Sequence, residues 1–240
     1  MRMSYKFGKD EISPVKDYIN KYYDVNKSNL HLVYRGCDLK EFNLNPLTEE
    51  WSDSWFQEFP STKNKTLLTL PGRITSWKGI EEFITLFTKL DTNKYHGLIP
   101  GPVKKNKEKY YKSLLKLIKQ KNLSSHITFC GSRSDIANVY KISDIILNLS
   151  SKPEPFGRTI IEAAACGTRV MGWNRGGVKE SIELINPAGL VEYGNISALS
   201  EKISKFHETP KPESIPDIFT KEYLANATTN IYELALAKER

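Results

Sequence analysis

The sequence predicts an α/β fold in which helices cover a doubly wound, mostly parallel sheet. Two observations lead to this prediction. From residue 66 onward, short apolar runs alternate with amphipathic stretches, which is the pattern of consecutive βα units. Several apolar runs also end in glycine-containing segments that precede an amphipathic stretch, as strand–loop–helix connections do.

The individual elements follow from the length and composition of these runs. The expected strands lie near residues 31–35, 66–71, 95–99, 126–130, 144–149, 169–173 and 189–192. The expected helices lie near residues 78–90, 104–121, 134–141, 158–166, 177–184 and 195–207. Together they predict one doubly wound domain.

Both ends of the chain carry a helix outside this alternation. Residues 11–23 fit a helix with Ser13 as N-cap and Pro14 at its first position. A final amphipathic helix near 220–238 can be capped by Thr220. The residues expected along one side of that helix are Tyr223, Ala227, Ile231 and Leu234.

Residues 46–63 read as a connecting segment with a short amphipathic helix. We expect its large aromatic side chains to form local core rather than a ligand platform. They are Trp51, Trp55, Phe56 and Phe59.

These patterns divide the chain into three parts. Residues 1–29 form a helix and linker, residues 30–208 form the α/β domain, and residues 209–240 form a proline-containing linker and the terminal helix.

Charge and composition limit the functions to consider. The chain has 240 residues, of which 39% are hydrophobic, so neither disorder nor a fibrous structure is expected. Its net charge of +7 suggests an anionic partner: nucleic acid, an acidic membrane surface or a phosphorylated ligand. Charge alone does not choose among the three.

A cytoplasmic location is expected from two features. No apolar run approaches the roughly 20 residues that span a bilayer, and the first residues lack the apolar core of a signal peptide. The cysteines Cys37, Cys130 and Cys166 are odd in number and far apart, so neither a disulfide framework nor a zinc site is indicated.

Two carboxylates stand out in the stretch KPEPFGRTIIEAAACGTRV, residues 152–170. Glu154 lies in a loop, and Glu162 follows within an apolar helical run. A carboxylate can accept both hydroxyl groups of a sugar diol. Between the two, PFGR leads into a helix whose first N–H groups can point at an anion, and Gly157 permits close approach of the backbone. The spacing of the two residues alone, however, favours a simpler interpretation, in which Glu154 is an ordinary loop carboxylate and Glu162 a helix residue that faces solvent.

Two further segments could hold a phosphate. In LPGRITSWKGI, residues 70–80, Arg73 and Lys78 follow a strand at the carboxyl edge of the sheet, where open α/β folds bind ligands. Solvated surface charge is the simpler interpretation of this pair alone. In NRGGVKE, residues 174–180, the glycine pair could donate amides to a phosphate or could form a plain βα turn. Arg133, in CGSRSD, could border a nucleotide base.

In this order, the pieces resemble the carboxyl-terminal half of GT-B glycosyltransferases, in particular the large retaining family four. YRGCDLKEF, PGRITSWKGIEEFITLFTKL and EPFGRTIIEAAACGTRV are similar to that family's entry segment, its GR…KG segment and its E-x7-E block. NRGGVKESI and AGLVEYGNISALSEKI continue the match, which covers roughly residues 11–240. The resemblance implies a Rossmann-like domain that binds a nucleotide sugar. It therefore favours a binding role for Arg73, Lys78, Glu154 and Glu162 over the simpler interpretations given above.

The resemblance also implies a role for each site residue. Arg73, Lys78 and Glu154 would be catalytic: the two cations would hold the donor diphosphate, and Glu154 would contact the transferred sugar. Glu162 would bind the ribose diol. The other donor-binding residues implied are Gly72, Arg133, Phe156, Gly157, Arg158 and Thr159. No D-x-D motif occurs, which fits a family that needs no metal and no cofactor beyond its NDP-sugar substrate.

Family members have an amino-terminal, acceptor-binding domain that this sequence does not match. We therefore expect a donor-binding half that transfers a hexose to a glycan, lipid-linked or lipopolysaccharide-type acceptor, with the acceptor domain possibly on a separate chain. The two end helices would be inter-domain and crossover helices. The isolated chain is expected to turn over poorly, because a cleft with one wall cannot exclude water.

Two rival interpretations remain. KKNKEKYYKSLLKLIKQK, residues 104–121, carries eight lysines and fits a solvated helix face, or a basic module that binds peripherally to the anionic inner face of a membrane. Nucleic acid is not expected as a partner, because arginine and groove-fitting geometry are missing from this segment. The second rival is a GT-B sugar-nucleotide epimerase, against which the E-x7-E block argues.

Overall fold

The computed structural model describes residues 14–26, 29–208 and 210–238. A six-stranded parallel sheet forms its centre, in the order β3-β2-β1-β4-β5-β6. The strands are β1 Thr66–Thr69, β2 Tyr95–Pro100, β3 Ile127–Gly131, β4 Ile145–Asn148, β5 Arg169–Trp173 and β6 Leu190–Val191. The strand order changes direction between β1 and β4, so their carboxyl ends open a crevice for a ligand. The predicted doubly wound α/β fold is confirmed.

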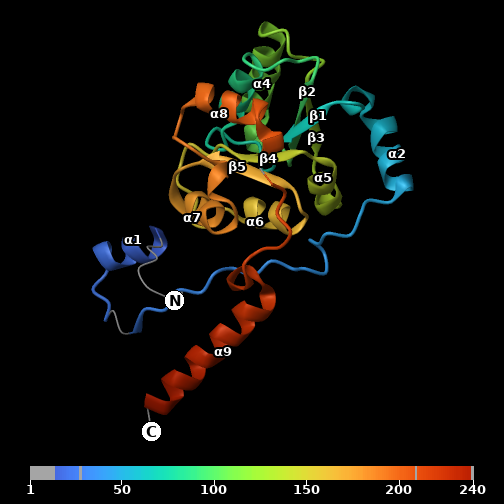
Figure 1. Cartoon of the computed structure of the whole chain (residues 1–240). Coiled ribbons are helices and arrows are strands. Elements are labelled where there is room, and N and C mark those ends of the chain that lie inside the picture. Colours follow the sequence, from blue (N-terminus) through green and yellow to red (C-terminus); the bar gives the residue numbers. More distant parts are fainter. Residues whose placement is uncertain (1–13, 27–28, 209, 239–240) are drawn as a thin grey trace.

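Helices cover both faces of the sheet (Figure 1). One layer contains α3 Ile80–Phe87, α4 Glu108–Gln120 and α8 Ile196–Ser204, which share one apolar core with the sheet. The other layer contains α5 Ile136–Ile142, α6 Arg158–Ala165 and α7 Gly176–Ile185. Both layers are needed because the strands have no solvent-facing side: every residue of β2 and β4, for example, is buried.

The aromatic segment before the sheet forms α2, Glu49–Glu58, beside the β3 edge. Thr48 caps this helix by accepting a hydrogen bond from the N–H of Trp51. Trp55 is almost completely buried and packs with Leu67, Leu98 and Val139. The prediction that these aromatic residues are local core is therefore confirmed.

The strand predicted near residues 31–35 is wrong. Leu32 and Tyr34 are buried at alternate positions, as in a strand, and pack in the core around α6 and α7. Leu32 takes part only in an isolated bridge, and within the described residues neither residue belongs to a strand of the six-stranded sheet. A few residues after Tyr34, the same segment pairs with the residues that precede α9: Cys37 forms an isolated parallel bridge with Thr220. The N–H of Cys37 donates to the carbonyl of Phe219 at 2.7 Å, and the N–H of Lys221 donates to the carbonyl of Cys37 at 3.1 Å.

The two end helices form as expected. Helix α1 spans Pro14–Tyr22; Ser13 and residues 11–12 lie outside the described residues. Helix α9 spans Lys221–Lys238, and the hydroxyl of Thr220 caps it by accepting from the N–H of Tyr223 at 3.1 Å. Ala227 and Ile231 are buried, whereas Leu234 is 49% exposed. Helix α9 projects away from the sheet in Figure 1.

No helix in the described ranges combines the length and the apolar character that crossing a membrane would require.

The cysteine thiols are expected to resist alkylation in the folded protein. Burial raises the pKa of Cys37 and of Cys130 to about 12, and that of Cys166 to about 11. At pH 8, on the order of one thiol in a thousand or fewer would then be the reactive thiolate. Mass spectrometry after brief iodoacetamide treatment should show no modification without denaturant and three modifications with it. Rapid labelling of the native chain would contradict the observed burial.

Candidate active site

A cleft of about 670 Å³ opens at the carboxyl ends of β1 and β4. Most of its lining comes from the loop between β1 and α3, the loop that enters α6 with the first turns of that helix, and the extended segment that precedes Cys37; Ile19 of α1 and Glu180 of α7 complete it. The predicted site residues among its lining are Gly72, Arg73, Lys78, Glu154, Phe156, Gly157, Arg158, Thr159 and Glu162. Residues that sequence reasoning did not select also contribute, among them Tyr34, Arg35, Trp77 and Glu180.

The loop after β1 supplies two cations that differ in their surroundings. Lys78 is largely buried, with its ammonium 4.7 Å from the centre of the Trp77 ring. Arg73 is exposed and, among the described residues, forms no ion pair. Gly79 positions Lys78, because its left-handed backbone (φ 76°) turns the chain into α3 directly against Leu149. Arg73 is therefore available to an incoming anion, whereas Lys78 is already paired.

Glu154 is the partner of Lys78, and it is held by three donors on one oxygen. Its Oε1 accepts from Lys78 Nζ at 2.6 Å, from Asn148 Nδ2 at 3.2 Å, and from the hydroxyl of Ser150. Asn148 and Ser150 stand at the carboxyl end of β4, so the strand end fixes the carboxylate. All three contacts fall on Oε1, which leaves Oε2 able to accept from a hydroxyl group of a ligand.

Glu162 is buried in α6, being only 8% exposed, so it is not the solvent-facing residue that spacing alone suggested. Arg158 donates to its Oε1 through Nε at 3.1 Å and Nη2 at 2.7 Å. The hydroxyl of Tyr140 lies 3.3 Å from its Oε2. Burial, and next the charge of Glu162, raise the pKa of Tyr140 well above its usual value, so Tyr140 stays a hydrogen-bond donor.

The start of α6 faces the same cleft. Gly157 adopts a left-handed conformation (φ 68°) immediately before the helix. The N–H of Ile160 donates to the carbonyl of Gly157 at 3.0 Å, whereas the N–H groups of Arg158 and Thr159, at the first two helical positions, lie too early in the helix for an intrahelical acceptor. The hydroxyl of Thr159 is buried and, within the described part of the chain, has no hydrogen-bond partner. A buried hydroxyl without a partner at a helix start favours a polar or anionic ligand there.

The glycine pair of residues 174–180 has a packing role. The N–H of Gly177 donates to the carbonyl of Glu154 at 2.7 Å. A Cβ atom at Gly177 would lie 2.6 Å from the backbone of Pro155 and Phe156. The sequence left open whether this glycine pair donates amides to a phosphate or forms a plain βα turn. The structure favours the turn for Gly177, because its N–H is already hydrogen bonded to Glu154.

Arg133 does not line the cleft. Its guanidinium donates to both carboxylate oxygens of Asp135, at 2.8 and 2.7 Å, and to Glu58 of α2. It also stacks over Trp55, 5.5 Å from the ring centre. The structure thus ties Arg133 to α2, and its predicted place beside a base finds no support in this geometry.

Comparison with known proteins decides the family. The sequence profile of the family described as Glycosyl transferases group 1 matches residues 52–220. The chain belongs to the group 1 glycosyltransferases. The matched range contains Arg73, Lys78, Glu154 and Glu162, so the family match and the cleft involve the same residues.

Individual relatives agree with this assignment. N-acetyl-α-D-glucosaminyl L-malate synthase of Bacillus anthracis is 24% identical over 77% of this chain and 46% of its own length. A glycosyltransferase structure from Rickettsia africae ESF-5 superposes with a TM-score of 0.82 at 28% identity, covering 92% of this chain and 61% of that one. Anabaena HepE in complex with UDP and glucose gives a TM-score of 0.70 at 24% identity, over 80% of this chain and 50% of that one, a likeness of fold.

The matched part of this group 1 glycosyltransferase chain spans less than half the length of three curated relatives, between 38% and 46%.

Sequence reasoning missed several residues of the site, among them two that hold Glu154. Asn148 and Ser150 lie only six and four residues before Glu154, and their position at a strand end next to the motif could have indicated them. Tyr34 and Glu180, whose side chains hydrogen bond at 2.6 Å, are 146 residues apart, and no local pattern links them.

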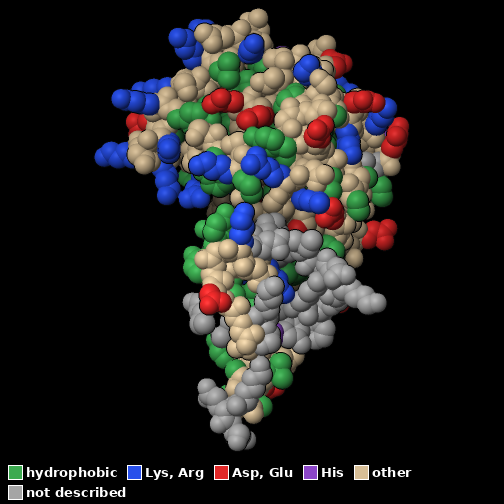
Figure 2. Space-filling model, turned by 90° about the vertical axis from the view of Figure 1, so that its left-hand side faces the viewer, with side chains coloured by type: hydrophobic (Ala, Val, Ile, Leu, Met, Phe, Trp, Pro, Cys, Tyr) green, Lys and Arg blue, Asp and Glu red, His purple; other side chains and the backbone are tan. Residues whose placement is uncertain are grey.

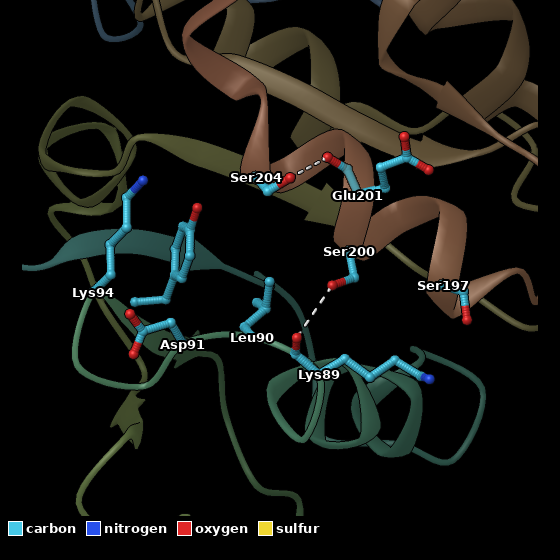
Figure 3. Close-up of a pocket in the computed structure, with 9 residues that line it drawn as sticks. Lys89, Leu90, Asp91, Lys94, Ser197, Ser200, Glu201 and Ser204 are labelled. Atoms are coloured by element: carbon cyan, nitrogen blue, oxygen red, sulfur yellow. Dashed lines mark hydrogen bonds between the residues drawn. The ribbon is translucent and has the colours of Figure 1, made fainter.

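A second hollow, of about 580 Å³, lies between the α3–β2 connection and α8 (Figure 3). Lys89, Asp91, Lys94 and Glu201 border it, and Lys89 and Lys94 point to opposite sides. None of the predicted site residues of this glycosyltransferase lines this second hollow. The candidate active site is therefore the first cleft, at the carboxyl ends of β1 and β4.

In the ranges that the structure describes, no three or more His, Cys, Asp or Glu side chains are grouped so that they could hold a metal ion.

Proposed function

We propose that this chain is the donor-binding part of a retaining glycosyltransferase that transfers a hexose from an NDP-sugar. The observation that carries the proposal is the convergence of Arg73, Lys78, Glu154, Glu162 and the start of α6 on one cleft. A sugar nucleotide needs cations and amide donors for its diphosphate and carboxylate acceptors for its two diols, and this cleft contains both kinds of group.

The diphosphate would bind between Arg73, Lys78 and the start of α6. In this arrangement the N–H groups of Arg158 and Thr159 and the hydroxyl of Thr159 donate to phosphate oxygens. Arg73, whose charge no acidic side chain of the described residues neutralises, supplies the positive charge. These groups stabilise the negative charge that develops on the leaving nucleoside diphosphate, so the mechanism requires no metal ion. Addition of EDTA should therefore leave donor binding unchanged.

The two glutamates would then accept hydrogen bonds from the sugar hydroxyl groups on either side of the diphosphate, those of the hexose and those of the ribose. Glu154, with Oε1 occupied by three donors, presents Oε2 to the transferred hexose. Glu162 would accept the hydroxyls of the ribose, with Arg158 and Tyr140 keeping its carboxylate in place. The complex of Anabaena HepE with UDP and glucose supports a uridine nucleotide as the first donor to test.

The rest of the reaction would need a second domain. We propose that acceptors of the glycan, lipid-linked or lipopolysaccharide type bind to an acceptor domain that faces the cleft, either on the same polypeptide or on another chain. Helices α1 and α9 would pack across that junction; the half-exposed Leu234 and the exposed Tyr232 and Leu236 on α9 support this role. The match to group 1 glycosyltransferases favours transfer over the epimerase alternative.

Replacement of Glu162 by Gln tests the site directly. Gln keeps the size of the side chain but removes one acceptor and the charge, and hydrogen bonds to charged groups contribute about 1.5–3 kcal/mol. Calorimetric titration against UDP and a panel of other nucleoside diphosphates should therefore show roughly tenfold weaker binding or more.

Glu183→Gln is the matched control, because Glu183 also pairs with a cation four residues away, Lys179, but does not line the cleft. This variant should bind as the parent chain does. A 2′-deoxynucleoside diphosphate should bind both the parent and Glu162→Gln weakly. Equal affinity of Glu162→Gln and the parent chain for the ribonucleotide would overturn the ribose assignment.

A further inference from the structure

The positive charge of this chain is concentrated in one segment. Residues 104–121 contain eight lysines and one glutamate, a net charge of +7, which equals the net charge of the whole chain. The other 222 residues are therefore balanced between acidic and basic side chains. Helix α4 lies at the top of the molecule in Figure 1, and Figure 2 shows Lys and Arg side chains there as well as farther down the α/β domain, where Asp and Glu side chains lie among them.

The structure separates the two faces of this segment. Leu114 and Ile118 of α4 are buried, and Tyr110, Tyr111 and Leu117 pack against the same core. The lysines lie on the other side, and all except Lys107 are exposed. In the described part of the chain none of the eight forms an ion pair. The apolar residue that remains on this lysine face is Leu115, which is 42% exposed.

We propose that this lysine face, formed by the exposed lysines of residues 104–121 together with Leu115, binds peripherally to a bilayer rich in anionic lipids. A helical basic face whose lysines form no ion pairs within the described residues is complementary to such a surface, and each lysine held close to it contributes independently of any specific contact. Leu115 adds an apolar side chain that can enter the headgroup region.

Two features favour lipid over nucleic acid as the partner. The segment has no arginine, and both of its tyrosines are directed into the core, so no aromatic ring on this face is free to stack on bases. The lysine face therefore provides diffuse charge and one apolar side chain, which match a lipid surface better than a base-lined groove.

The location of this face is compatible with donor binding in the cleft. Helix α4 packs in the layer with α3 and α8, whereas the cleft opens beside α6 in the opposite layer and at the strand ends. Binding to a membrane through α4 would thus leave the cleft uncovered. The inference does not depend on the proposed function, since lipid binding and nucleotide binding involve different residues.

Sedimentation of the full chain with vesicles tests the proposal. The vesicles are phosphatidylcholine alone or with about one third phosphatidylglycerol, at low and at high salt. We expect binding to the anionic vesicles at low salt and little binding to neutral vesicles or at high salt. Replacing Lys109, Lys112, Lys116 and Lys119 by Gln should weaken binding by at least about tenfold.

A second variant separates a local effect from total charge. Replacing Lys40, Lys63, Lys89 and Lys211, four exposed lysines outside this face, changes the net charge by the same amount and should leave lipid binding nearly unchanged. Far-ultraviolet circular dichroism and UDP titration confirm that both variants are folded. Equal losses in both variants would overturn the proposal. So would tighter binding to duplex or single-stranded nucleic acid than to anionic vesicles at the same salt concentration.

Discussion

Lys78→Ala is expected to weaken nucleoside diphosphate binding by one to two orders of magnitude, and to reduce sugar transfer by the complete enzyme about 100- to 1,000-fold. The ammonium group lies 2.6 Å from Glu154 and its side chain is only 14% exposed, so its charge acts in a poorly solvated place. Loss of one group that stabilises developing charge typically costs about 2.7–4 kcal/mol. Titration of the chain with UDP measures the first effect, and a donor-turnover assay measures the second.

The same substitution leaves Glu154 without its cation, which also lowers the stability of the fold. A urea titration should therefore accompany the binding measurement, so that binding is compared only where the variant is folded. Lys94→Ala is the control: Lys94 also lies over an aromatic ring, 5.3 Å from the centre of Tyr95, but outside the cleft. If folded Lys78→Ala bound UDP as tightly as Lys94→Ala, Lys78 would not contact the diphosphate.

Gly79→Ala is expected to destabilise the chain by about 3–5 kcal/mol, the largest effect of a single methyl group in this site. Its φ of 76° is unfavourable for any residue with a Cβ atom. In addition, the new Cβ atom would lie 2.0 Å from the carbonyl oxygen of Leu149, which follows β4 and is completely buried. The loop carrying Lys78 or the end of β4 would have to move, so UDP binding should be lost as well.

Gly194→Ala separates the two contributions. Gly194 has nearly the same φ, 78°, but a Cβ atom there meets no atom within 4 Å. Only the backbone cost of about 1–2 kcal/mol is expected at this position. Chemical unfolding of both variants gives the comparison, and similar losses of stability would show that Gly79 does not pack tightly against β4.

The sheet was predictable because its strands are buried on both faces and therefore appear as uninterrupted apolar runs, such as residues 145–147. The failure at residues 31–35 has a physical cause. Alternating burial of Leu32 and Tyr34 requires only an extended chain on an apolar surface, and here that surface belongs to the core around α6 and α7. Whether an extended segment joins a sheet depends on hydrogen-bond partners that the local pattern does not specify.

The site was predictable where its chemistry lies close together in the sequence. Glu154, Glu162 and the residues between them form one short block, and their common cleft follows from a loop entering a helix at the sheet edge. Arg133 illustrates the opposite case. Its pairing with Asp135 is local, but its second partner, Glu58, is 75 residues away on α2, and Arg133 is not among the residues that line the cleft.

The bridge between Cys37 and Thr220 brings the chain into and out of the α/β domain at the same point. Leu32 and Tyr34 lie before this bridge and are buried in the same core as Phe219, so the segment before Cys37 is packed on the domain as well as bonded to it. One wall of the cleft is therefore anchored by backbone that comes much later in the chain, next to the start of α9.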